Sequence, residues 1–215
     1  MENTLVSTPK THIYVPVVAL TLYAVASGYL MSLIPLMLPE YGLESSLASW
    51  LASAFYAGLL VGALAIEPIV AKFGHRKAYT YCLVAFISTI AAMLLLPSSM
   101  GWLAARFIAG ISVAGIFVIV ESWLLHGDES GRAKRLGLYM GALYGGSSLG
   151  QLGIGVLGIQ GSVPFIAIGT LLILAVLVVV FGDSEQPPQE HTEAMSLKQI
   201  MKLNHAAIIG CVVSA

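Results

Sequence analysis

Long apolar stretches alternate with short polar connectors along this chain. An apolar stretch of about 20 residues crosses the hydrocarbon core of a bilayer as a helix, because lipid offers no partner for backbone amides. The pattern therefore predicts an all-α integral membrane protein with six transmembrane helices. The six stretches are Ile13–Leu38, Leu47–Val70, Ala78–Leu96, Gly101–Leu125, Leu136–Leu157 and Pro164–Phe181.

The region after the sixth stretch changes character twice. Residues 182–205 are polar and contain proline, which predicts a linker, and within it Met195–Leu203 has the spacing of a short amphipathic helix on the membrane surface. Residues 206–215 are apolar again but too few to span, so they are interpreted as the start of a seventh helix. The sequence thus predicts a helical bundle over residues 1–181. It also predicts that the chain is a fragment or one half of a longer protein. The alternative is a complete six-helix protein with an interfacial tail.

Composition and charge narrow the class of protein. Of the 215 residues 58% are hydrophobic and 10% are charged, against about 25% charged in soluble domains, so a soluble fold is excluded. The formal net charge of −1 offers no basic excess for nucleic acid. Cys82 and Cys211 lie in apolar stretches, and no histidine has ligand spacing from another histidine or a cysteine, so we expect neither a metal nor a cofactor.

The cations are distributed on one side of the predicted spans. The first, third and fifth connectors contain no Lys or Arg. Cationic residues are retained in the cytoplasm, so both the N-terminus and the linker are predicted to be cytoplasmic. Nine of the ten cations obey this rule, namely Lys10, Lys72, Arg76, Lys77, Arg132, Lys134, Arg135, Lys198 and Lys202.

The tenth cation, Arg106, falls inside a span with Glu121 on one helix face. They are fifteen residues apart, about 22 Å along a helix, so we predict that each has its own partner: Arg106 a carboxylate or an anionic substrate group, Glu121 a proton. The alternatives are that Arg106 extends to the periplasmic interface and that Glu121 pairs with the Lys134–Arg135 region. Polar residues within spans indicate function, so the predicted substrate and proton pathway comprises Arg106, Glu121, Tyr23, Ser27, Tyr56, Tyr144, Ser148 and Gln151.

For other residues in and near the spans, the simplest interpretation is a structural role in helix packing or anchoring. Interhelical hydrogen bonding is the alternative for the polar stripes on the first two spans, including Ser49 and Ser53. Trp50, Trp102 and Trp123 lie near span ends and are predicted to be interface anchors. G-x-x-x-G pairs predict close helix packing: Gly58 with Gly62, Gly141 with Gly145, and Gly146 with Gly150. The enzyme-like patterns at 146–150 and 153–158 lack the strand-to-helix turn that their chemistry needs, so no enzyme is expected.

The connector between the second and third spans reads Lys72-Phe-Gly-His-Arg-Lys77, and this sequence resembles the signature loop of the major facilitator superfamily of secondary transporters. Glu67, however, stands where the family has Gly, and Ala71 stands where it has Asp. The fourth span begins with Ala105-Arg-Phe-Ile-Ala-Gly110, which resembles a second signature of the same family. Together with the later Val120-Glu-Ser-Trp123, this segment is similar to a group of mostly uncharacterised bacterial permeases. The glycine-rich fifth span resembles the antiporter signature only loosely. The resemblance covers residues 12–215.

This resemblance implies the N-terminal half of a major facilitator fold, with six helices as two inverted three-helix repeats. It implies a secondary active transporter of the bacterial inner membrane that moves a small solute by alternating access, with symport or antiport open. The implied partners are the solute, the bilayer and a C-terminal six-helix half. The signature loop is expected to act in the conformational change, and its residues are Glu67, Lys72, Gly74, Arg76 and Lys77. Gly74 is predicted to form a tight turn that sets the inward–outward equilibrium, with Glu67 in the role of the missing Asp. The alternative is a six-helix membrane scaffold without transport.

Overall fold

The computed structural model describes residues 13–125 and 129–183, and all regular structure in these ranges is helical. Three predicted spans are confirmed to within two residues. They are α1 (Tyr14–Met37), α3 (Ser99–Leu125) and α7 (Val163–Phe181). The predicted linker over 184–205 and the seventh helix over 206–215 lie outside the described residues.

The second and third predicted spans form one element, α2 (Leu47–Leu95), which bends sharply at Gly74. Gly74 has φ 78° and ψ 163°, a backbone conformation that side chains with a Cβ rarely adopt. The bend separates arms of residues 47–73 and 75–95, about 40 Å and 31 Å long at 1.5 Å per residue. The predicted tight turn between two helices is therefore confirmed, and each arm has the length of a membrane span.

The fifth predicted span is not one uniform α-helix. After the one-turn helix η2 (Glu129–Gly131) come α4 (Arg132–Met140), a π-helical turn η3 (Gly141–Gly145), α5 (Gly146–Gln151) and α6 (Gly153–Leu157). Glycine is a poor helix former, and several glycines in this run allow the helix to widen at η3 and to lose its regular hydrogen bonding at Leu152, whose φ of −67° and ψ of −16° remain helical. The described part of the chain thus contains four helices long and apolar enough to cross a membrane, and six separate spans stay a prediction.

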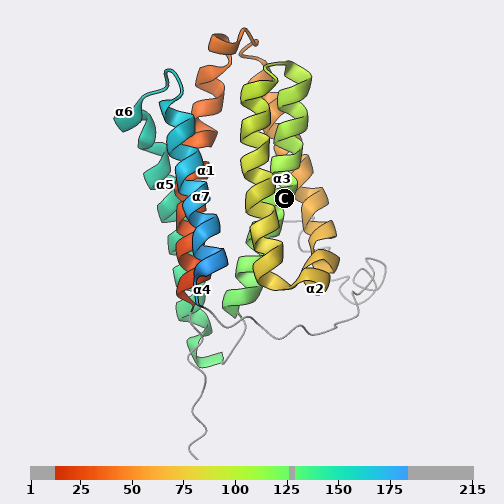
Figure 1. The fold of residues 1–215 in the computed structure, drawn as a ribbon, viewed down its shortest axis with the longest axis vertical. Coiled ribbons are helices and arrows are strands. Elements are labelled where there is room, and N and C mark those ends of the chain that lie inside the picture. Colours follow the sequence, from red (N-terminus) through yellow and green to blue (C-terminus); the bar gives the residue numbers. More distant parts are fainter. Residues whose placement is uncertain (1–12, 126–128, 184–215) are drawn as a thin grey trace, which may run out of the picture.

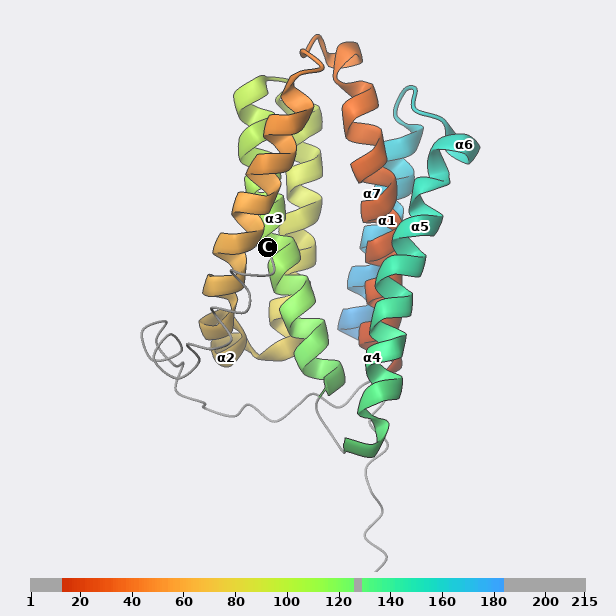
Figure 2. The same cartoon turned by 180° about the vertical axis from the view of Figure 1, so that it is seen from behind.

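The helices form two groups that run side by side (Figures 1 and 2). One group has α1 between α5 and α7, and the other consists of the two arms of α2 packed on α3. The ring of Tyr23 on α1 joins the groups, with centroid distances of 5.4 Å to Phe86 on α2 and 6.3 Å to Phe117 on α3. The buried core lies between the two groups.

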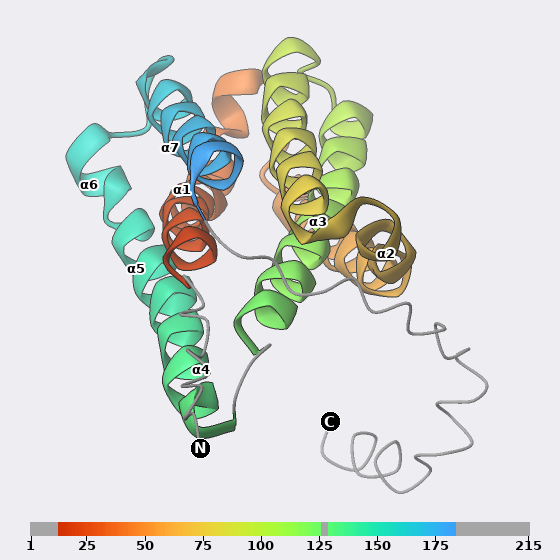
Figure 3. The same ribbon diagram turned by 60° about the horizontal axis from the view of Figure 1, so that its bottom comes forward.

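The connectors alternate between the ends of the bundle (Figure 1). One end holds η1 (Pro39–Tyr41), the α2–α3 turn and the loop before α7. The other end, seen in Figure 3, holds the bend at Gly74 and the beginning of α4. Among the described residues, the Lys and Arg side chains other than Arg106 belong to this second end, which agrees with the charge pattern of the sequence.

Glycines bring two helix pairs into backbone contact. A Cβ on Gly58 of α2 would overlap the carbonyl oxygen of Phe107, and one on Gly110 of α3 would overlap the carbonyl oxygen of Phe55. Close approach is the reason for small residues at these positions. Gly62 also lies against the backbone of Ile111, at a slightly larger distance, so the prediction of tight packing at the Gly58 and Gly62 pair is confirmed.

The second such contact joins α1 to α5. A Cβ on Gly28 would overlap the carbonyl oxygen of Ser147, and one on Gly150 would overlap that of Val25. The predicted packing pair Gly146 and Gly150 is confirmed, because Gly146 also lies against α1. The prediction is wrong for Gly141 and Gly145 within the described part of the chain, where nothing lies within 4 Å of a Cβ at either position. These two glycines bound the π-helical turn instead.

Candidate functional site

Arg106 lies inside the bundle, not at its surface. Its side chain is only 2% exposed. The Nη2 group donates to the sulfur of Met31 on α1 at 2.9 Å, and the guanidinium carbon lies 4.3 Å from the ring centroid of Phe55 on α2. The alternative in which Arg106 extends to the membrane interface is therefore wrong, because the guanidinium points to the crossing of α1, α2 and α3.

The described surroundings of Arg106 are mainly aromatic and contain no carboxylate paired with it. The hydroxyls of Tyr23 and Tyr56 are close enough to interact electrostatically with the guanidinium, but among residues 13–125 and 129–183 no carboxylate forms an ion pair with it. A thioether and an aromatic face are weak partners for a desolvated charge. A buried cation without an anion is costly, so this position is suited to receive a negatively charged group.

A line of buried hydroxyls continues from this site. Tyr23 is 2% exposed and its hydroxyl shares a hydrogen bond with Ser27. Tyr79 on the second arm of α2 and Tyr139 on α4 are also buried, and both interact electrostatically with Tyr23. The Tyr79 hydroxyl has no hydrogen-bond partner within the described residues. The sequence reasoning missed Tyr79 and Tyr139, because a tyrosine near a span end is usually an interface residue.

Glu121 lies near the end of α3 and is exposed. Its carboxylate is close enough to Tyr139 to interact electrostatically. The two following residues contact His75: Ser122 Oγ lies 3.0 Å from His75 Nε2, and the ring of the buried Trp123 packs edge-on against His75. Arg106 is therefore enclosed by three helices, whereas Glu121 is accessible at the cation-rich end.

The remaining predicted pathway residues are divided between the two helix groups. Tyr56 lies on the first arm of α2, whereas Tyr144, Ser148 and Gln151 lie on η3 and α5, the elements packed against α1. All four side chains are exposed in this chain, Tyr56 by 64% and Tyr144 by 66%. The structure brings Tyr56 near Arg106 and leaves the other three on a different helix pair.

The conformational loop is anchored to the end of the sixth predicted span. Arg76 Nη2 donates to the carbonyl oxygen of Gly182 at 2.6 Å, just after α7 ends. Lys72 Nζ lies 5.3 Å from the ring centroid of Phe73, and the side chains of Glu67, Lys72 and Lys77 are exposed. The loop thus ties the bend of α2 to the point where the linker begins, a contact that the sequence pattern does not reveal.

The tryptophans differ from their predicted role. The prediction of interface anchors is wrong for Trp102 and Trp123, which are 1% and 3% exposed inside the bundle. Trp102 Nε1 donates to the Met93 carbonyl at 2.9 Å, so its polar atom is satisfied internally. Trp50 is exposed and fits the prediction.

Comparison with known proteins agrees with this architecture. Residues 17–215 match the Major Facilitator Superfamily. The chain is 30% identical over 200 residues to uncharacterised MFS-type transporters of Enterobacter sp. (strain 638) and of Yersinia pestis (strain Pestoides F), and 28% identical to one of Escherichia coli. These alignments cover 91% of this chain and 52% of each relative, so the chain spans about half the length of the relatives.

A solved structure has the same fold. The POT family transporter PepTSo superposes with a TM-score of 0.60 at 15% sequence identity, over 83% of this chain and 39% of that chain. The resemblance noted at the signature loop therefore extends to sequence and architecture over most of the described residues. The protein is an integral membrane protein, and the chain belongs to the Major Facilitator Superfamily.

Proposed function

We propose that this chain is the N-terminal half of a secondary active transporter, which moves a small solute by alternating access together with a C-terminal six-helix half. The observation that carries the proposal is Arg106, a buried cation at a three-helix crossing with no carboxylate partner in the described ranges. A solute with a carboxylate or phosphate group is the natural partner for such a guanidinium. The exposed hydroxyls of Tyr56 and Tyr144 then line the solute path.

Two inverted three-helix repeats are part of this proposal. The reciprocal glycine contact between Gly58 and Gly110 recurs between Gly150 and Gly28. By this correspondence α1 in the first repeat is equivalent to α3 in the second, and the first arm of α2 is equivalent to the run from α4 to α6. Repeats of this kind are common in secondary transporters. The cation-rich end is assigned to the cytoplasm by the positive-inside rule.

Glu121 is proposed as the proton carrier of the coupled cycle. It lies about 22 Å from Arg106 along α3, and the buried hydroxyls of Tyr139, Tyr79 and Tyr23 lie in the region between them. Solute and proton would thus bind at different depths of the same half. Movement of one half against the other then exposes both sites to the opposite side.

The test uses the full-length protein reconstituted from its natural gene. A library of small anionic and zwitterionic solutes is screened by thermal shift, and the best compound is carried into transport assays in proteoliposomes. We expect Arg106→Gln to weaken binding of that compound at least tenfold and Arg106→Lys to weaken it less. Arg132→Gln, which removes an exposed cation of α4, serves as the control and should bind normally. Binding that survives Arg106→Gln unchanged contradicts the proposed solute site.

Two further variants separate coupling from conformational change. Glu121→Gln should abolish proton-driven accumulation and retain solute exchange, because exchange needs no net proton movement; accumulation that persists would exclude Glu121 as the carrier. Gly74→Val should impair transport with membrane insertion intact, with Gly137→Val as the control because Gly137 has open space around it. A folded full-length protein that no solute stabilises would favour the membrane-scaffold alternative.

A further inference from the structure

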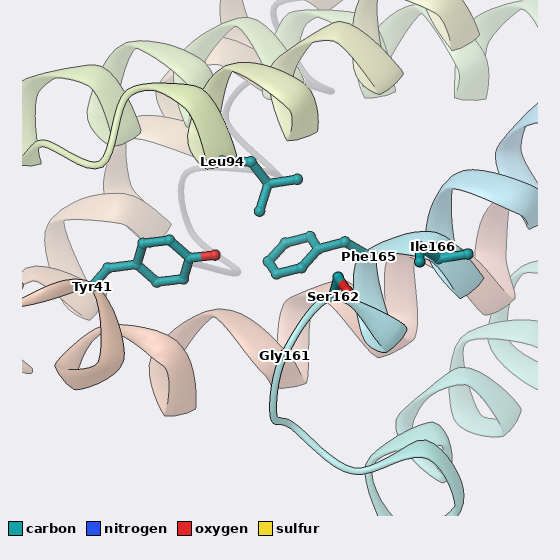
Figure 4. A pocket seen from close by; sticks show the side chains of 6 residues that line it. All are labelled: Tyr41, Leu94, Gly161, Ser162, Phe165 and Ile166. Carbon is teal, nitrogen blue, oxygen red and sulfur yellow. The ribbon is translucent and has the colours of Figure 1, made fainter.

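A cavity of about 320 Å³ lies at the end of the bundle opposite to the cation-rich end (Figure 4). It is lined by Tyr41, Leu94, Gly161, Ser162, Phe165 and Ile166. Figure 4 shows Tyr41 and Phe165 pointing toward one another from opposite sides, with Leu94 between them on the α2 side. The volume is at the lower end of the range for small-ligand sites, and the lining is mainly apolar with two hydroxyls.

The walls of this cavity are held by specific contacts. The ring of Tyr41 packs against Trp102 at a centroid distance of 5.4 Å, and Trp102 is bonded to the carbonyl of Met93, next to Leu94. On the opposite wall Gly161 has φ 70° and leads into α7, whose first turn is closed by the Ile166 N–H donating to the Ser162 carbonyl at 3.0 Å. The cavity is therefore bounded by ordered elements.

The flank that contains the cavity has the character of a lipid-facing surface. The outward positions of α7 are apolar, including Ile173, Leu174 and Leu177. The hydroxyl of Thr170 donates to the Ile166 carbonyl, and that of Ser88 on α2 donates to the Val84 carbonyl, so both polar groups are satisfied within their own helices. A membrane span can expose such a surface to hydrocarbon.

Charge around the cavity mouth restricts the headgroup of a lipid. Glu40 precedes Tyr41, Glu44 follows it by three residues, and both side chains are exposed. Apart from the buried Arg106, the described Lys and Arg residues lie at the other end of the bundle. Anionic headgroups are repelled here, whereas an ammonium group is attracted by the two carboxylates.

We propose that this cavity binds one acyl chain and the interfacial region of a zwitterionic phospholipid from the leaflet at the cation-free end. The acyl chain enters between Leu94 and Ile166 from the lipid side, and Phe165 packs against it. The hydroxyls of Tyr41 and Ser162 lie at the level of the ester and phosphate oxygens. The site is separate from the transport pathway and does not depend on the proposed function.

The experiment uses the full-length protein in lipid nanodiscs of phosphatidylethanolamine doped with a photoactivatable phosphatidylethanolamine that carries a diazirine on its acyl chain. After irradiation, labelled peptides are mapped by mass spectrometry. We expect labelling of residues 161–166 to exceed labelling of 173–180 on the same helix at least fivefold. Equal labelling along α7 would reflect only the bulk lipid around any span and overturns the proposal.

Two sets of variants test the pocket and its headgroup preference. Leu94→Phe fills the cavity from an exposed position and should reduce the 161–166 labelling at least threefold, whereas Leu177→Phe, farther along the lipid face, should leave it unchanged. A phosphatidylglycerol probe of the same chain should label the site less, and Glu40→Gln with Glu44→Gln should remove that difference. Equal labelling of this site by both probes in the unmodified protein overturns the proposal.

Discussion

The α1–α5 crossing and the α2–α3 crossing share one contact but differ in the continuity of their helices. In the second, Phe107 precedes Gly110 by three residues and Phe55 precedes Gly58 by three, and each glycine meets the partner's carbonyl. Val25 and Ser147 stand in the same relation to Gly28 and Gly150. One local rule thus forms both crossings.

The helices that obey this rule are built differently. Both α2 and α3 are regular helices where they cross. In contrast, α5 has only six residues between the π-helical turn and the break at Leu152. A close backbone contact therefore needs the glycines and not a long regular helix. A short segment between two irregularities shifts more easily than a regular helix, so we infer that the α1–α5 side accommodates strain that the α2–α3 side cannot.

The largest effect is expected from Gly110→Ala. The added methyl overlaps backbone atoms of Phe55 and Leu59, which cannot rotate away, so we expect a loss of about 3 kcal/mol of unfolding free energy. Equilibrium unfolding of the full-length protein in mixed micelles measures it. Gly169→Ala on α7, where no described residue lies within 4 Å of the new Cβ, is the matched control: it should lose no stability and gain about 0.5–1 kcal/mol, because alanine is the better helix former.

Gly150→Ala tests the difference between the two crossings. Its methyl overlaps the backbone of Val25 and Tyr29 as severely, but the neighbouring π-helical turn and the break at Leu152 allow α5 to move. We therefore expect a smaller loss, about 1 kcal/mol, in the same unfolding experiment. A loss equal to that of Gly110→Ala would remove the distinction between the regular and the irregular crossing.

At the other end of the scale, the double variant Gly141→Ala with Gly145→Ala should lose no stability and gain some instead. Both positions have open space and alanine is the better helix former, so the variant should gain about 0.5–1 kcal/mol per site. Hydrogen exchange of the 141–152 amides should slow. If the π-helical turn supplies the movement of this side, solute exchange should also slow; unchanged transport with slower amide exchange would assign the turn a purely structural role.

The helices were predictable wherever a span is uniformly apolar. For α1, α3 and α7 the hydropathy pattern alone defines both ends, and Gly74 marks the bend of α2 because its positive φ suits glycine. The π-helical turn at Gly141–Gly145 was not predictable, because a glycine-rich run has the same pattern in an α-helix and in a π-helix. Contact with α1 accompanies the wider form.

The candidate site was predictable in residue type but not in depth or partners. Arg106 stands out as a cation within a span, yet only the fold shows that it turns inward toward Met31 and Phe55. Ser122, the partner of His75, lies about 100° around the helix from Glu121, so the periodicity that selects Glu121 excludes it. The bond from Arg76 to Gly182 joins residues 106 positions apart, a distance over which no local pattern carries information.

The bond from the Tyr29 hydroxyl to the Gly158 carbonyl, 2.6 Å long, has a consequence for the biosynthesis of this protein. It joins residues 129 positions apart, and at about 5–20 residues per second the ribosome needs roughly 6–26 s to translate that interval. The two arms of α2 and α3 are consecutive in the chain and complete their contacts soon after they emerge. Helix α1, although made first, waits for α5 and α7 before most of its contacts can form.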